Sequence, residues 1–195
     1  MSRRFKGDLD GAISDFGNAI ALNPSGFQAY GNRANAWHDK GNFDEAIADH
    51  NRAIELNPDS AEAYFNRGLT HKAKGNLAAA IADFTRSIEI KPHSSQAYVY
   101  RGNIWRGKGE IDRAIQDYGS AIAADPRNAR AYANRGLALL LECKEAEAKR
   151  DFERCLQLDP GLNTELHVSI RGIGDNGSSQ SGCSSSSRKL SAVDK

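Results

Sequence analysis

The chain has 195 residues, and its 26 basic and 25 acidic side chains leave a net charge close to zero at neutral pH. A nucleic-acid surface must neutralise several phosphates, and neither this balance nor any basic stripe supports one. No apolar run reaches the roughly 18 residues that a membrane span needs, and the N-terminus has no apolar signal region. We therefore expect a cytoplasmic protein that neither binds nucleic acid nor inserts into a membrane.

The five prolines of the chain divide it into equal lengths. They stand 34 residues apart, at Pro24, Pro58, Pro92, Pro126 and Pro160. Such a period predicts a repeat array, in which neighbouring units stack and no single central core forms. The period gives a partial unit at 1–26, mainly its second half, and four full units at 27–60, 61–94, 95–128 and 129–162.

The first half of each unit carries the spacing of a helix. An aromatic residue is followed four places later by a small one and three places after that by a larger one. The pairs are Tyr30 and Ala34, Tyr64 and Gly68, Tyr98 and Gly102, and Tyr132 and Gly136. A glycine then ends this helix at Gly7, Gly41, Gly75 and Gly109, where a positive φ costs little. The last unit has Cys143 at the equivalent place.

The second half of each unit predicts a second helix that packs on the first. An alanine is followed four residues later by a ring, which places a small and a large side chain on one face and lets two helices approach closely. The ring positions are Phe16, His50, Phe84, Tyr118 and Phe152. Asn42 with Glu45 has the spacing of a capping box at the start of one such helix.

After Pro160 the apolar period continues at Leu166, Ile170 and Ile173, which predicts a cap helix over 163–173 with one polar face. From Gly174 the composition changes to serine and glycine. Such a segment cannot bury enough apolar area to offset the entropy of ordering it, so we expect a disordered tail at 174–195.

The 34-residue pattern resembles the tetratricopeptide repeat family, and the resemblance covers residues 7–162. It implies an all-α protein, a right-handed α-solenoid of antiparallel helix pairs. This solenoid would contain four full repeats, the partial N-terminal one and the cap helix. The chain departs from the family where a leucine is common and arginine stands instead, at Arg33, Arg67, Arg101 and Arg135.

These arginines have a counterpart in the second helices. Aspartate recurs in register at Asp15, Asp49, Asp83, Asp117 and Asp151. We expect a ladder of Arg–Asp pairs, either within a repeat or between neighbours, because a bidentate guanidinium suits such a fixed geometry. The alternative is that both sets are independent solvated charges. Either way the feature is structural.

Nothing in the sequence indicates catalysis. The five histidines fall at scattered phases, and there is no Cys-x-x-Cys, paired-His helix motif or glycine-rich phosphate loop. We therefore expect a protein that is not an enzyme, with no cofactor and no bound metal.

The resemblance places function on the concave face, which the first helices build in this family. Asparagines recur there, and an amide offers a donor and an acceptor that can pair with the backbone of an extended peptide. Apolar side chains between them could anchor ligand side chains. The expected partner-binding residues are Asn32, Asn35, Phe65, Asn66, Leu69, Val99, Tyr100, Asn103, Arg130 and Asn134. Asparagine is also common at these places without a ligand.

The expected function is a protein–protein interaction scaffold that binds a partner peptide or protein segment in the concave groove. One alternative is a chaperone adaptor with a degenerate carboxylate clamp, in which the asparagines are present and the basic residues are absent. Another is the targeting arm of a larger multidomain enzyme or transporter. The first repeat is incomplete in the sequence, so its exposed face could also form a weak dimer.

Overall fold

A computed structural model describes residues 7–164 and 166–167, and these residues form helices without any strand. The chain divides into two compact units, Met1–Arg101 and Gly102–Lys195, which are described separately. The boundary falls within α6 (Ser95–Gly107).

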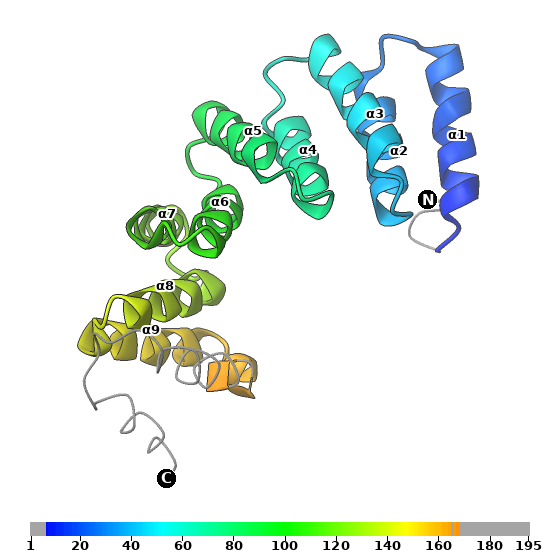
Figure 1. Cartoon of the computed structure of the whole chain (residues 1–195). Coiled ribbons are helices and arrows are strands. Elements are labelled where there is room, and N and C mark those ends of the chain that lie inside the picture. The colour runs from blue at the N-terminus through cyan, green and yellow to red at the C-terminus, as the bar shows by residue number, and fades with distance from the viewer. Residues whose placement is uncertain (1–6, 165, 168–195) are drawn as a thin grey trace. The chain divides into compact units, whose positions relative to one another are not determined.

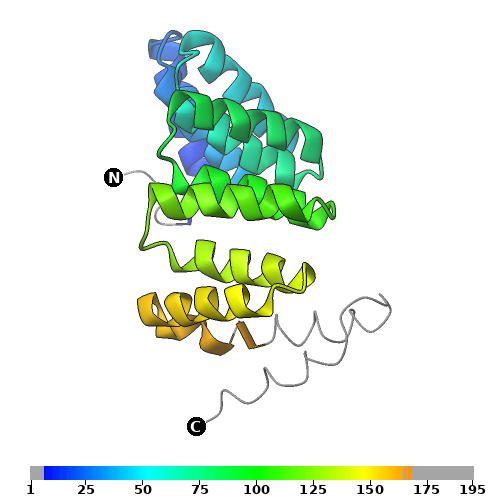
Figure 2. The ribbon, with the colours of Figure 1, turned by 90° about the vertical axis from the view of Figure 1, so that its left-hand side faces the viewer.

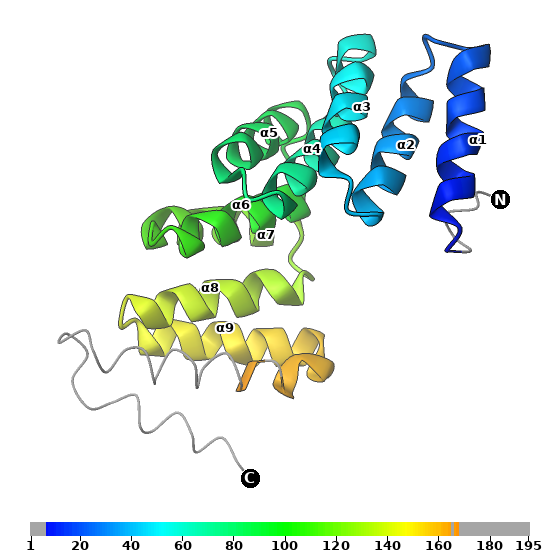
Figure 3. The ribbon, with the colours of Figure 1, turned by 45° about the vertical axis from the view of Figure 1, so that its right-hand side comes forward.

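The first unit contains five consecutive helices before α6 (Figure 1). They are α1 (Leu9–Leu22), α2 (Phe27–Asp39), α3 (Phe43–Leu56), α4 (Ala61–Ala73) and α5 (Leu77–Ile90). Each helix packs against the next, and the chain reverses direction between them, as Figure 3 shows for α1, α2 and α3. Helices α2 and α3 therefore form one antiparallel pair, and α4 and α5 form the next.

The turn inside each repeat uses a left-handed residue. Gly41 and Gly75 have φ of 84° and 87°, a conformation that glycine adopts without steric cost. Cys143 takes the same place in the last repeat, with φ of 58°. The turn geometry is therefore kept there despite the side chain, at the modest cost that a non-glycine residue incurs in this region.

A small residue on the first helix receives the ring of the second. Phe84 of α5 is fully buried, and a Cβ added to Gly68 of α4 would lie 2.9 Å from its Cε1 atom. That approach is closer than carbon atoms tolerate, so glycine is required opposite a six-membered ring. The pair α2 and α3 differs, since Ala34 faces this position and the ring is the smaller imidazole of His50.

The second unit contains α7 (Ile111–Ala124), α8 (Ala129–Leu141), α9 (Glu145–Leu158) and the short 3₁₀ helix η2 (Pro160–Leu162). Figure 2 shows α8 and α9 side by side, in yellow-green and yellow to orange. Their core contains the buried side chains of Leu137, Leu139, Phe152 and Leu166.

The last described residues pack onto α8 and α9. Residues 163–164 and 166–167 are helical, and Leu166 packs into the core of α8 and α9. The remainder of the cap expected over 163–173, and the tail expected over 174–195, lie outside the described residues.

The helix starts are capped by side chains at some positions only. Ser60 and Asn128 accept hydrogen bonds from the backbone N–H groups of Ala63 and Ala131, at 3.2 and 3.1 Å. The capping box expected at Asn42 is wrong. Asn42 does occupy the N-cap of α3, but its side chain makes no capping hydrogen bond within the described part of the chain.

Candidate functional site

The recurring charges pair within each repeat and hold its two helices together. Arg67 of α4 donates two hydrogen bonds to Asp83 of α5, from Nε at 2.9 Å and from Nη2 at 2.6 Å. The same bidentate pairing, over sixteen residues, joins Arg33 to Asp49 and Arg135 to Asp151. These pairs are partly buried, so the arginines serve the scaffold. The expected ladder is confirmed at these three repeats.

Arg101 also contacts the preceding repeat within the first unit. Its Nη1 atom donates to the hydroxyl of Thr85 at 2.9 Å. Arg67 makes a comparable bond to the Asn51 side-chain oxygen at 2.7 Å. The arginine row therefore links neighbouring second helices as well as the two helices of one repeat.

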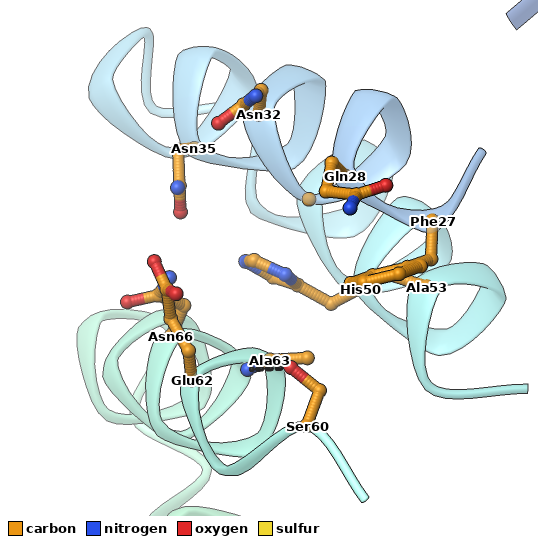
Figure 4. A pocket seen from close by; sticks show the side chains of 11 residues that line it. Phe27, Gln28, Asn32, Asn35, His50, Ala53, Ser60, Glu62, Ala63 and Asn66 are labelled. Atoms are coloured by element: carbon orange, nitrogen blue, oxygen red, sulfur yellow. Dashed lines mark hydrogen bonds between the residues drawn. The ribbon is translucent and has the colours of Figure 1, made fainter. Parts of the chain in front are cut away.

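A polar hollow of about 130 Å³ lies between α2 and α4 (Figure 4). Asn32 and Asn35 reach it from α2, and Glu62 and Asn66 reach it from α4. Gln28 lines it at the end near Phe27. Three of the expected partner-binding residues, Asn32, Asn35 and Asn66, are thus brought to one place.

His50 of α3 also lines this hollow. Figure 4 shows its ring pointing toward the space between Asn35 and Asn66. The side chain is fully buried, and neither ring nitrogen has a hydrogen-bond partner among the described residues. Burial, followed by the positive charge of Arg67, lowers the pKa of His50 to about 3. The ring is therefore a neutral imidazole at pH 7, with one donor and one acceptor unused.

A second hollow, of about 380 Å³, adjoins the first and shares Glu62 and Asn66 with it. Phe65, Ser94 and Gln96 are among its other lining residues. Asn66 therefore lies between the two hollows, where one extended segment could contact both.

An aromatic cluster gives this surface its apolar part. The ring of Phe65 lies 5.6 Å from that of Tyr100 and 5.7 Å from that of Phe84, between centroids. Phe65 and Tyr100 are half-buried, while Phe84 belongs to the core. Leu69 and Val99, the other apolar residues expected here, are also half-buried. The cluster combines a rigid base with partly accessible rings, as a binding anchor requires.

The remaining expected residues belong to the second unit. Asn103 is engaged internally, since its side-chain oxygen accepts a 2.8 Å hydrogen bond from the hydroxyl of Tyr118. Arg130 is exposed and Asn134 is half-buried. Leu137, also on α8, is buried in the core with Leu166.

The described residues contain no group of three or more His, Cys, Asp or Glu side chains that could hold a metal ion. None of the helices in residues 7–164 and 166–167 combines the length and apolar character that crossing a bilayer requires.

His50 is not among the binding residues expected from the sequence, because its position is that of a core ring. For His50 a signal existed in the repeats themselves. The other complete repeats place Phe84, Tyr118 or Phe152 at this position, each opposite a glycine, whereas His50 stands opposite Ala34. The coupled change of ring and small residue marks this repeat as different.

The family comparison agrees with the helical pattern. A model described as "TPR repeat" matches residues 34–75 and 102–141, and models described as "Tetratricopeptide repeat" match residues 61–94 and 129–162. No curated protein matches the sequence.

Solved structures of tetratricopeptide proteins superpose on the chain. A crystal structure of MamA has a TM-score of 0.75 and 29% sequence identity, and the match covers 82% of this chain and 93% of that chain. MamA from Desulfovibrio magneticus RS-1 has a TM-score of 0.73 at 14% identity, with 83% and 91% covered. YrrB, reported as a TPR protein with an unusual peptide-binding site, has a TM-score of 0.70 at 18% identity, with 87% of each chain covered.

The two structures with 14% and 18% identity show the fold alone. Together with the matches to the family, they establish an all-α solenoid of tetratricopeptide repeats. Repeats of this kind serve as scaffolds for protein–protein interaction. The chain belongs to the tetratricopeptide repeat family.

Proposed function

We propose that this chain is a non-catalytic scaffold that binds an extended segment of a partner protein along its first helices. In the first unit the segment would cross the two hollows beside α2 and α4. The observation that carries the proposal is the convergence of Asn32, Asn35 and Asn66 on one hollow.

The amides of these asparagines are available to a ligand. Asn35 and Asn66 are half-buried and Asn32 is exposed, and their side chains form no hydrogen bond with other described residues. A helix satisfies its own backbone internally, so such side chains are free to pair outward. Each offers a donor and an acceptor, which matches the alternating N–H and C=O groups of an extended peptide.

The aromatic cluster supplies the second requirement, an apolar anchor. Phe65 lines the larger hollow, and its ring contacts that of Tyr100, with Leu69 and Val99 also half-buried nearby in sequence. Backbone pairing alone gives little affinity, because a peptide loses conformational freedom on binding. One or two ligand side chains on this cluster would offset that loss. At the corresponding phase of the second unit we assign Arg130 and Asn134 to contacts with the peptide backbone. Asn103 would contribute only its N–H donors, because its side-chain oxygen accepts from Tyr118.

The chaperone-adaptor alternative is less well supported. The lining of the first hollow contains one charged side chain, and that is the acidic Glu62. A terminal carboxylate placed there would lack a compensating cation. The peptide-binding site reported for YrrB shows that a protein of this fold can bind a peptide.

Peptides selected from a random display library against the whole chain provide the ligand for a test. Replacing Asn66 and Asn134 together by Ala should weaken peptide binding by roughly 1–3 kcal/mol, the range for losing one or two net hydrogen bonds. The melting temperature should stay nearly unchanged, because neither side chain bonds to the scaffold. Binding is measured by fluorescence anisotropy and melting by circular dichroism. A variant that binds at full affinity but melts earlier would show the asparagines to be structural.

A further inference from the structure

The geometry around His50 points to a pocket that selects one kind of ligand side chain. We infer that the hollow between α2 and α4 takes an Asn or Gln carboxamide from the bound segment, and that His50 is its specificity-determining residue. This inference rests on the proposed function, since it assumes that a peptide lies on this surface.

The first step concerns the position of the ring in the repeat. The equivalent rings Phe84, Tyr118 and Phe152 are apolar or carry one hydroxyl, and each packs against a glycine. A Cβ at Gly102 or Gly136 would lie 2.8 or 2.4 Å from the facing ring. Ala34 already has that Cβ, so the smaller imidazole fits where a six-membered ring would collide. Packing is thus satisfied at this repeat by a ring that also brings two nitrogens.

The second step concerns those nitrogens. Both His50 nitrogens are buried without a hydrogen-bond partner among the described residues. A buried polar group left unpaired is unfavourable for the folded state, so the arrangement favours any group that enters and pairs with it. A neutral imidazole has one N–H donor and one acceptor nitrogen. Its best partner therefore offers both functions.

The third step concerns charge. An acidic ligand group finds no cation in the lining, because His50 is neutral and the charged residue present is Glu62. A basic ligand group meets the field of Arg67, which is near enough to disfavour a charge on His50. Glu62 is exposed, so its attraction is screened by solvent. Both charged classes are therefore disfavoured, and a neutral polar side chain remains.

The fourth step concerns size and access. A volume of about 130 Å³ exceeds the roughly 10–15 Å³ that a single water needs. His50 is fully buried, and the half-buried amides of Asn35 and Asn66 stand on either side of the space toward which its ring points (Figure 4). For a ligand to reach the ring, these two amides would turn aside by a change of side-chain rotamer. A carboxamide, with two N–H donors and an oxygen that accepts two hydrogen bonds, can then pair with His50 and with the two asparagines at once.

The matched variant for the test replaces Ala34 and His50 by the residues that stand at these positions in the next repeat, glycine and phenylalanine. His50→Phe alone would bring a ring against the Cβ of Ala34, so Ala34→Gly accompanies it, as Gly68 accompanies Phe84. The double variant should fold and lack the two nitrogens. Ala34→Gly alone, which keeps His50, is the control for the added space.

The experiment selects random displayed peptides on the whole wild-type chain, on Ala34→Gly and on the double variant. The wild type and Ala34→Gly should enrich Asn or Gln at one fixed position. In the best synthetic peptide, changing that residue to Asp or Leu should lower affinity at least tenfold. The double variant should lose this preference and bind the Leu peptide at least as well as the Asn peptide.

The outcomes separate the two proposals. Failure of the wild type to enrich any peptide contradicts peptide binding itself. Enrichment without a carboxamide preference contradicts only the role of the His50 pocket, and so does a preference that the double variant retains. Circular dichroism of all three proteins establishes that each is folded before the affinities are compared.

Discussion

The ring position of the second helix is occupied in two different ways in repeats 27–60 and 129–162. Phe152 packs into the core of the second unit with Leu137 and Leu166, and its ring lies against Gly136. His50 occupies the same register, faces Ala34 and extends toward a polar hollow. Both repeats have the Arg–Asp pair that joins their two helices, whichever ring is present. Under the proposed function, the polar ring of His50 serves ligand binding as well as packing.

The largest expected effect comes from removing the apolar ring. Phe152→Ala should lower the free energy of unfolding of the second unit by about 3–5 kcal/mol, through lost burial and the cavity left behind. His50→Ala should lower the free energy of unfolding of the first unit by less than half as much. It removes the packing of the ring, but it also removes two buried unpaired nitrogens that are unfavourable for the folded state. Urea unfolding followed by circular dichroism measures both. Equal losses would mean that the two rings contribute equally to stability and would contradict the expected difference between the two repeats.

The next largest effect should be a loss of stability at acid pH that is due to His50. Its pKa is about 3 in the folded chain, against an ordinary value of 6.5, because of burial and then the charges of Arg67, His38 and His71. The unfolded chain therefore binds a proton between these values that the folded chain does not. The contribution of His50 to the free energy of unfolding is therefore fully present above pH 6.5. It decreases as the pH falls toward 3, by roughly 4 kcal/mol.

The variant with Ala34→Gly and His50→Phe is the control for this titration, since it lacks the group. The pKa of His71 is also lowered, mainly by burial, but His71 is present in both proteins. The difference in unfolding free energy between them, followed from pH 7 to pH 4, isolates His50. A difference that stays constant over this range would show that His50 keeps its ordinary pKa in the fold.

A somewhat smaller effect is expected from the Arg–Asp pair, which repeat 61–94 has in common with the two repeats compared above. The side chains of Arg67 and Asp83 are 21% and 6% exposed, so removing one leaves the other largely buried without its partner. Arg67→Leu or Asp83→Ala should each cost roughly 2–4 kcal/mol. A double-mutant cycle should give strongly non-additive losses. The exposed pair Arg52 and Glu55 is the control and should show little coupling. Additive losses at Arg67 and Asp83 would show that the pair contributes no coupling energy to the fold.

The sequence predicted the helices well because the repeat presents the same signals several times. Gly41 and Gly75 end first helices with positive φ, and Cys143 keeps that conformation in their place. The Arg and Asp registers predicted a pairing but left open whether it lies within a repeat or between repeats. The packed structure answers the question, because the packing of α4 against α5 brings Arg67 within hydrogen-bond distance of Asp83 in the same repeat.

The site was predicted less completely, for physical reasons. Asn32, Asn35 and Asn66 could be placed on one face by helical periodicity, and they do line one hollow. Hydrogen bonds across helices are not visible in a periodicity, so the engagement of Asn103 by Tyr118 was not foreseen. The orientation of the His50 ring depends on the space left by Ala34, which is a property of the packed structure.

The central claim is that peptides bind on the first helices beside His50, and side-chain NMR tests it most directly. The amide signals of Asn35 and Asn66 and the ring nitrogens of His50 would be followed during titration with a peptide selected on the wild-type chain. We predict saturable shifts of these signals at one common affinity, with little change at Arg86, which is exposed on α5. Shifts concentrated on the exposed residues of α3 and α5, with the His50 nitrogens unmoved, would contradict the account.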